Sequence, residues 1–150
     1  MTVTGYAPGA FDMFHIGHLN LIRNASDRCD RLVVGVVSDR LVTTAKNRVP
    51  VVDERERLAI VSAVRWVDTA VLEDVPDKVT MWHRLHFDVL FKGDDWKGTA
   101  KGARLEAAFA PLGVEVVYLP YTVHTSSTLL RAALASRVDG ATAHAMSEAG

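Results

Sequence analysis

The residues 31–37 form a nearly unbroken run of apolar, mostly β-branched side chains, and this run limits the possible folds more than any other stretch. A strand that is apolar at almost every position is buried on both faces, which is typical of a parallel sheet covered by helices on each side. Helical and strand-like patterns alternate along the rest of the chain. We therefore expect an α/β fold built on a parallel sheet.

The alternation defines ten elements. Strands are expected at residues 2–6, 31–37, 67–72, 87–92 and 114–119. Helices are expected from residue 18, from a cap at Asp53, and at residues 77–85, 101–112 and 126–136. We interpret residues 40–51 as a mobile loop or a frayed helix. The order predicts a Rossmann-like, doubly wound sheet of five parallel strands, with ligands at the carboxyl ends of the strands.

Size and composition indicate one globular domain. The chain has 150 residues, of which 49% are hydrophobic and 23% charged, so it can bury a real core. We expect a domain at residues 1–137 and a flexible tail at residues 138–150. A net charge of −1 gives no global basic field, so nucleic acid is not an expected partner. The sequence also predicts no membrane span, no signal peptide, a packing role for the single cysteine, Cys29, and a cytoplasmic location.

A short loop after the first predicted strand contains the most informative polar residues. His15 and His18 lie on either side of Gly17, where we expect the first helix to begin near Ile16. Both imidazoles and several free backbone N–H groups would then converge on one small volume, which the helix macrodipole makes attractive to an anion. The loop therefore predicts a phosphate-binding site.

Other interpretations of the histidines fit less well. The pair lacks the further Cys or carboxylate ligands of a zinc site, and the nearby glycines do not match the G-x-G-x-x-G dinucleotide fingerprint. Neither zinc nor NAD is expected. The other histidines considered, His83, His86 and His144, are interpreted as structural.

Two further polar motifs follow predicted strands. The hydroxyl cluster from Thr125 to Thr128, with Arg131 one turn later, could cap a helix only, or could also bind phosphates. The Asp94-Asp95-Trp96 stretch is either a polar turn with an aromatic lid or a base and ribose site, and Asp94 or Asp12 could approach magnesium through water. Both motifs fall at the same edge of the predicted sheet as the histidines.

These motifs together resemble the cytidylyltransferase-like nucleotidyltransferase family, most closely the bacterial glycerol-3-phosphate cytidylyltransferases. The resemblance extends from about residue 3 to residue 131. It is carried by G-A-F-D with H-I-G-H, by R-V-P-V through Glu54, Arg57 and V-D, and by K-G-D-D-W.

The resemblance implies a role for each matching residue. His15 and His18 would hold the phosphates and stabilise charge at the α-phosphorus. Lys46 would close over the phosphates, and Arg57 would assist at the substrate or triphosphate. The nucleotide-binding residues implied are Ala10, Phe11, Asp12, Gly17, Gly93, Asp94, Trp96, Thr125, Ser126, Ser127, Thr128 and Arg131.

Two departures from the family pattern leave alternatives open. Ala10 replaces the usual threonine, and residues 121–127 read Y-T-V-H-T-S-S where R-T-E-G-I-S-T is usual, so Tyr121 and His124 are candidates for a reshaped acceptor pocket. Residues 126–131 instead look like the S-S-T-x-x-R of adenylyltransferases. An adenylyltransferase acting on a sugar phosphate or nucleotide precursor, and a nucleotide-binding regulator without turnover, are therefore alternatives.

The expected reaction transfers CMP from CTP to a small phosphorylated or phosphonate alcohol such as glycerol 3-phosphate, and releases pyrophosphate. Mg²⁺ would accompany the triphosphate. A homodimer is expected from family habit and from the apolar character of the stretch joining the first helix to the second strand. No protein nucleophile is required.

Overall fold

The computed structural model describes residues 1–120, 122 and 125–148, and it contains five strands with helices between them. The strands are β1 (Thr4–Gly9), β2 (Arg31–Val37), β3 (Thr69–Glu73), β4 (Val89–Gly93) and β5 (Glu115–Leu119). The α-helices are α1 (Ile16–Ser26), α2 (Asp39–Lys46), α3 (Glu54–Ser62), α4 (Lys78–Leu85), α5 (Ala100–Phe109) and α6 (Ser127–Glu148). Two short 3₁₀ turns are η1 (Asp94–Trp96) and η2 (Ala110–Leu112).

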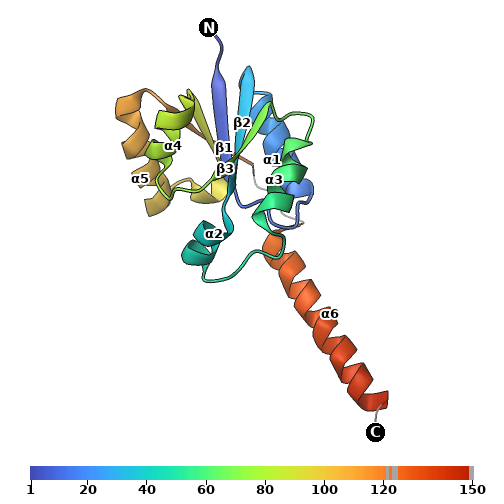
Figure 1. The fold of residues 1–150 in the computed structure, drawn as a ribbon. Coiled ribbons are helices and arrows are strands. Elements are labelled where there is room, and N and C mark those ends of the chain that lie inside the picture. The colour runs from blue at the N-terminus through green and yellow to red at the C-terminus, as the bar shows by residue number, and fades with distance from the viewer. Residues whose placement is uncertain (121, 123–124, 149–150) are drawn as a thin grey trace.

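The five strands form one parallel sheet in the order β3-β2-β1-β4-β5. Helices α1 and α3 cover one face, and α4 and α5 cover the other (Figure 1). This arrangement confirms the predicted doubly wound α/β fold. The connection after β1 crosses one face of the sheet, and the connection after β4 crosses the other. The sheet therefore has its switch point between these two strands, which is where such folds bind ligands.

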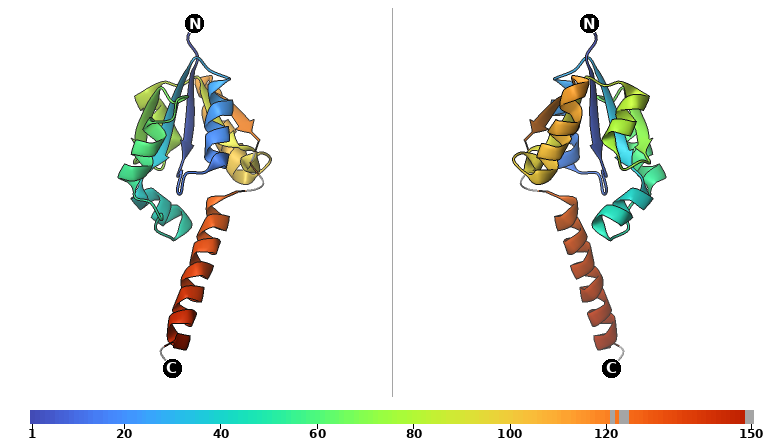
Figure 2. Two further views of the ribbon diagram at one scale, coloured as in Figure 1. Left: turned by 90° about the vertical axis from the view of Figure 1, so that its right-hand side faces the viewer. Right: turned by 90° about the vertical axis from the view of Figure 1, so that its left-hand side faces the viewer.

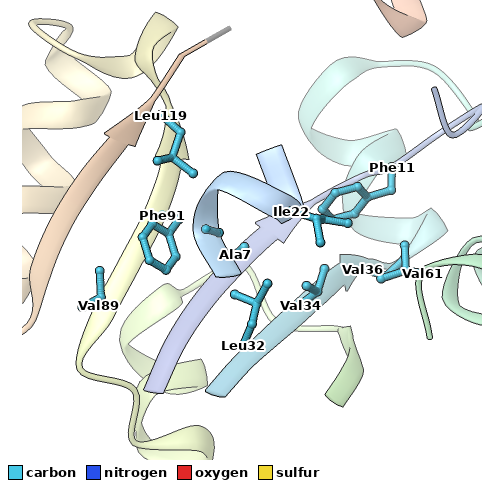
Figure 3. Close-up of a cluster of buried hydrophobic side chains, with 11 residues drawn as sticks. Ala7, Phe11, Ile22, Leu32, Val34, Val36, Val61, Val89, Phe91 and Leu119 are labelled. Carbon is cyan, nitrogen blue, oxygen red and sulfur yellow. The ribbon is translucent and has the colours of Figure 1, made fainter. Parts of the chain in front are cut away.

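The core has two layers, one on each face of the sheet. Alternate residues of β2 point to opposite faces: Val34 and Val36 join the layer under α1 and α3, with Ile22 and Phe91, while Val33 joins the layer under α4 and α5 (Figure 3). Residues 32–36 are all buried. The two-sided burial predicted for residues 31–37 is confirmed.

Strand β1 differs from its expected bounds because Pro8 and Gly9 belong to it. The pairing of β1 with β4 involves Gly5 and Tyr6, whereas its pairing with β2 continues to Gly9. Pro8 therefore lies beyond the β4 ladder, where its missing N–H group disturbs no bond to that strand. The strand carries the chain directly to the ligand-binding edge.

Residues 40–51 were expected to form a loop or a frayed helix, but most of the segment is the regular helix α2. Ser38 caps it by accepting a hydrogen bond from the amide of Leu41, and Leu41 and Val42 are buried. Asn47 ends the helix in the left-handed conformation, with φ of 53°. Capping and two buried apolar residues explain why the segment is ordered.

Helix α6 continues to Glu148, so its predicted end at Ser136 is wrong. It projects away from the carboxyl edge of the sheet (Figure 2), and residues 132–141 are all exposed. The division into a domain at residues 1–137 and a flexible tail beyond it stays a prediction. Within the described residues, none of the helices has the length and apolar character needed to cross a membrane.

The stretch joining α1 to β2 does not form the apolar surface on which the homodimer was predicted. Ile22, Ala25 and the apolar residues of β2 belong to the core. Exposed apolar side chains lie instead on α3 and α6, including Ile60, Leu129 and Leu134. Any self-association would therefore use a different face from the one the sequence suggested.

Candidate active site

A cleft of about 260 Å³ opens at the carboxyl edge of the sheet, at the switch point between β1 and β4. The end of β1, the loop before α1, helix α2, η1 and the start of α6 all contribute to it. The predicted site residues that line it are Ala10, Phe11, Asp12, His15, Gly17, His18, Lys46, Thr125, Ser126, Ser127, Thr128 and Arg131. Segments up to 120 residues apart in the chain thus meet as the resemblance implied.

The two histidines are fixed by backbone hydrogen bonds. His15 is the N-cap of α1, and its Nδ1 accepts a bond of 3.0 Å from the amide of Gly17. The Nδ1 atom of His18 accepts a bond of 3.3 Å from the amide of His15, and the two rings stack with centroids 3.8 Å apart. Each neutral ring therefore carries its proton on Nε2, from which it can donate.

Glycine at position 17 makes this stacked arrangement possible. A Cβ atom there would lie 2.8 Å from Cε1 and 3.0 Å from Nδ1 of His15. Any larger residue would therefore push the His15 ring away from its capping bond. The sequence suggested that Gly17 lets a ligand approach the backbone, and the structure adds that it makes room for His15.

Both imidazoles are neutral at neutral pH. Burial, followed by the neighbouring His15 and by Lys46, lowers the pKa of His18 to about 3, although Asp12 opposes the shift. Burial also lowers the pKa of His15. The histidines can therefore act as hydrogen-bond donors at physiological pH, while permanent positive charge must come from other residues.

Three cationic side chains provide that charge. Lys46, Arg48 and Arg131 line the cleft, and burial together with the two arginines lowers the pKa of Lys46. Nε of Arg48 and both Nε and Nη1 of Arg131 are buried without a hydrogen-bond partner in the described part of the chain. Since an unpaired buried guanidinium N–H is costly, these donors indicate a site built for an anion.

Asp12 connects three parts of the cleft. Its carboxylate accepts hydrogen bonds of 2.9 Å from the amides of Val51 and Val52, and it pairs with Nη2 of Arg131 at 2.8 Å. Although burial opposes ionisation, these amides and Arg131 hold the pKa of Asp12 below its usual range. Both carboxylate oxygens of Asp12 thus position other parts of the cleft, and the nucleotide-binding role of Asp12 stays a prediction.

The start of α6 joins the histidine loop through hydroxyl groups. Ser126 accepts a hydrogen bond of 3.1 Å from the amide of Leu129, which is a capping contact. Ser127 donates to the carbonyl of Asp12 at 2.7 Å and lies 3.4 Å from Nε2 of His15. The hydroxyl group of Ser126 therefore caps the helix, and Ser126 and Ser127 both line the cleft. Thr125 and Thr128 line the cleft as well.

Arg57 does not reach the cleft, which corrects its predicted catalytic role. It is 1% exposed and donates to the carbonyls of Val52, Ala10 and Val37, while its Nη2 pairs with Asp39 at 2.6 Å. These bonds join β1, β2 and the entry to α3. Arg57 is therefore a structural residue that supports the floor of the site.

The stretch after β4 is also placed differently from the prediction. Asp95 lines the cleft, whereas Gly93, Asp94 and Trp96 do not. The Trp96 ring lies instead beneath the ammonium of Lys92, at 4.0 Å from its centroid, and lines a separate hollow between α4 and α5. Gly93, Asp94 and Trp96 are therefore not among the described residues that line the cleft, and their role in nucleoside binding stays a prediction.

Sequence reasoning missed Arg48, Asp95 and Thr122 as lining residues. Arg48 and Asp95 were within the quoted motifs, but no spacing rule selects them over their neighbours. Tyr121 and His124 lie outside the described residues. The side chain of Thr122 accepts a hydrogen bond of 3.3 Å from the side-chain amide of Asn20, so this residue is connected to α1.

The histidines and the cysteine outside the cleft make structural contacts. His83 and His86 both lie against the Trp82 ring, with centroids 5.1 and 5.6 Å away. His144 is on the exposed part of α6. Cys29 is partly buried and its thiol donates to the carbonyl of Ala25. These positions fit the packing roles predicted for them.

No resident metal site is visible in the part of the chain that the structure describes. No group of three or more His, Cys, Asp or Glu side chains there could hold an ion. The carboxylates lining the cleft are Asp12, which is engaged, and Asp95. A magnesium ion would therefore depend on oxygens of the nucleotide for most of its ligands.

Comparison with known proteins agrees with this geometry. The model of the family described as "Cytidylyltransferase-like" matches residues 6–133, which include every described residue of the cleft. The chain belongs to the cytidylyltransferase-like family. The cleft can therefore be compared with the corresponding region of other members of this family.

Two curated relatives differ in name and in length. Over 96 residues the chain is 41% identical to ethanolamine-phosphate cytidylyltransferase from Arabidopsis thaliana, covering 60% of this chain but 22% of that protein. Over 115 residues it is 30% identical to FAD synthase from Pyrococcus abyssi, covering 75% of this chain and 77% of that one. The chain thus spans less than a quarter of the plant relative.

A solved structure shares the fold. The lipopolysaccharide core biosynthesis protein from Thermoplasma volcanium superposes with a TM-score of 0.70 and 27% identity, over 83% of this chain and all of that one. The α/β architecture of the family therefore extends over most of this chain.

Proposed function

We propose that this protein transfers CMP from CTP to a small phosphorylated or phosphonate alcohol, with glycerol 3-phosphate as the reference acceptor. The observation that supports it best is the set of unpaired guanidinium donors of Arg48 and Arg131 in the same cleft as the Nε2 donors of His15 and His18. A triphosphate supplies enough anionic oxygens to satisfy them. Membership of the family supports nucleotidyl transfer over other phosphate chemistry.

The proposed reaction is an in-line attack at the α-phosphorus. A phosphate oxygen of the acceptor forms the new bond while the bond to the oxygen bridging to the β-phosphorus breaks, and pyrophosphate leaves with that electron pair. The Nε2–H groups of His15 and His18 would donate to oxygens of the α-phosphate as charge moves there. Lys46, Arg48 and Arg131 would hold the outer phosphates, so the protein contributes alignment and electrostatic stabilisation.

Magnesium is part of the proposal as an ion bound to the triphosphate. When bound, it would neutralise charge on the departing pyrophosphate. Asp95 lines the cleft and would be the carboxylate that contacts the ion through water, whereas the sequence suggested Asp12 or Asp94.

Adenylyl transfer from ATP is a second candidate for the same cleft. Ser127 and Arg131, from the S-S-T-x-x-R stretch, both line the cleft, and the relative named FAD synthase matches most of this chain. The acceptor would then be a sugar phosphate or a nucleotide precursor.

Pyrophosphate release from CTP and ATP, measured with each of a panel of phosphorylated acceptors, tests the proposal. CTP is expected to be the preferred donor by at least about tenfold in kcat/KM, equivalent to about 1.4 kcal/mol. A preference for ATP would establish the second candidate. Tight nucleotide binding without any product would favour a regulator that has lost turnover, and would contradict both transfer reactions.

We also propose a homodimer in the cytoplasm. An apolar groove of about 610 Å³ runs between α6 and the body, lined by residues that include Phe14, Ile60 and Leu134. Ile60 is 44% exposed and Leu134 is 45% exposed, and a second copy of the same face could cover both. Sedimentation equilibrium is expected to give twice the chain mass, and Leu134→Lys is expected to give monomers. A monomeric unmodified chain at micromolar concentration would contradict this assembly.

A further inference from the structure

A second polar hollow, which we call the lysine pocket, lies between α4 and α5 on the opposite side of η1 from the cleft. It is about 410 Å³ in volume. Its charged lining residues are Asp77, Lys78, Lys92, Lys101 and Arg104. The proposed phosphate contacts use none of them, so this hollow requires its own explanation.

The two-residue period of β4 and the helical period of α5 bring these cations to the same hollow. Lys92 follows Leu90 by two residues on β4, so both point to the α4 and α5 face, and Leu90 is part of the core there. On α5, Lys101, Arg104 and Leu105 have the spacing of a single helix face. The cations therefore meet above the apolar layer at the carboxyl edge.

Most of this positive charge is not neutralised by the protein. Lys78 pairs with the buried Glu73, which also accepts a hydrogen bond from Tyr6, and Asp77 uses its carboxylate to cap α4. In the described part of the chain, by contrast, Lys92, Lys101 and Arg104 form no ion pair. Three unbalanced cations around one concave surface favour an anionic ligand.

Lys92 stands between the lysine pocket and the cleft. Its ammonium lies 4.0 Å from the centroid of Trp96, while the neighbouring Asp95 lines the cleft. The pKa of Lys92 is lowered to about 8, mainly by burial and also by the nearby charges of Lys78 and Lys46. The carboxylates of Glu73 and Asp95 oppose this shift. Since Lys46 and Asp95 belong to the cleft, one extended molecule could touch both sites.

We propose that the lysine pocket binds a second anionic group of the acceptor, which is therefore a phosphorylated compound with a carboxylate or another phosphate at its far end. The inference rests on the proposed nucleotidyl transfer. The attacking phosphate lies in the cleft near Lys46, and the second anion contacts Lys92, Lys101 and Arg104. Glycerol 3-phosphate fills only the first of these positions.

Matched acceptors test this assignment at pH 7, where Lys92 is largely charged. We compare glycerol 3-phosphate with 3-phosphoglycerate, and glucose 1-phosphate with glucose 1,6-bisphosphate, using the preferred nucleotide. In at least one pair, the acceptor with two anionic groups is expected to have a kcat/KM at least about tenfold higher, the effect of one charge-assisted hydrogen bond. Equal values in both pairs would overturn the inference.

Variants show whether the preference originates in this pocket. Arg104→Gln and Lys92→Met are each expected to reduce the ratio between paired acceptors by about fivefold to tenfold, which a general loss of activity cannot do. Lys97→Gln is the matched control, because Lys97 is exposed nearby and lines neither site. If the ratio is unchanged in both test variants, the preference originates elsewhere and the inference is wrong.

A binding measurement separates failure of this inference from failure of the proposed reaction. The indole N–H resonance of Trp96, assigned with Trp96→Phe, is followed by NMR while 3-phosphoglycerate or glucose 1,6-bisphosphate is added without nucleotide. A shift that Arg104→Gln weakens would support the anion pocket even if no acceptor is turned over. An unmoved resonance with both compounds would overturn it, even if glycerol 3-phosphate is a substrate.

Discussion

Arg57 is fully buried and the Arg131 side chain is 23% exposed, and the surroundings of their guanidinium groups are opposite in kind. Each of the three guanidinium nitrogens of Arg57 has a partner, and four of its five N–H groups donate to three carbonyls and a carboxylate. Arg131 has one partner, Asp12, while its Nε and Nη1 stay unpaired. The comparison shows that donor satisfaction, rather than residue type or burial, distinguishes an arginine of the scaffold from one that awaits an anion.

The largest effect is expected on the scaffold side. Arg57→Met should lower the free energy of unfolding by about 3 to 5 kcal/mol, because Asp39 and the three carbonyls lose their partner inside the protein. Urea unfolding measures the change. Arg131→Met provides the contrast and should lose less stability, because Asp12 keeps its hydrogen bonds from the amides of Val51 and Val52 and no carbonyl loses a donor. Equal losses in the two variants would remove the distinction between the two sites.

His18→Ala should have the next largest effect, and on turnover instead of stability. We expect kcat to fall by about 10²-fold or more, since one preorganised donor to developing charge is worth about 2.7 to 4 kcal/mol. His83→Ala is the control, because His83 lies against Trp82 away from the cleft. An unchanged kcat in His18→Ala would exclude this histidine from the mechanism.

Arg131→Met should also weaken nucleotide binding. The Kd for the preferred triphosphate is expected to rise about 10-fold to 100-fold, as expected when a hydrogen bond to a charged group worth about 1.5 to 3 kcal/mol is lost. Titration calorimetry measures it, with the exposed Arg23→Met as control. Unaltered affinity would mean that the unpaired donors of Arg131 do not face the triphosphate.

The effect that is smallest at neutral pH concerns acid stability. The folded-state pKa of His18, about 3, is below its ordinary value of 6.5, so the unfolded chain binds more protons between these values. Stability should be complete above pH 6.5 and should fall by at most about 1.4 kcal/mol per pH unit as the pH decreases toward 3. His18→Gln should reduce this slope in urea unfolding curves. The same slope in both proteins would contradict the proposed burial of a neutral imidazole.

The sequence predicted the parts of the fold and site that depend on local pattern. Residues 31–37 predicted a strand buried on both faces, and the spacing of His15, Gly17 and His18 predicted a helix start facing a ligand. Such features follow from periodicity and helix capping, and one short segment contains all the residues that determine them.

The errors concern features decided by distant contacts. Arg57 follows acidic residues on an ordinary helix start, and only the folded chain shows that it donates to the carbonyls of Ala10, just after β1, and of Val37, in β2. Likewise, Asp95 and Trp96 are adjacent in sequence, but the turn η1 directs them to different hollows. Helix α2 was missed because its stability depends on burying Leu41 and Val42, which its polar sequence does not show.

Helix α6 connects the cleft to a point far from the sheet. Ser127 and Arg131, which touch the histidine loop and Asp12, lie in its first turns, and the same helix continues to Glu148. At 1.5 Å per residue, a rod of this length extends roughly 25 Å beyond Arg131. An attachment at its far end is therefore expected to displace Ser127 and Arg131 within the cleft, and a tag fused there would perturb the site mechanically.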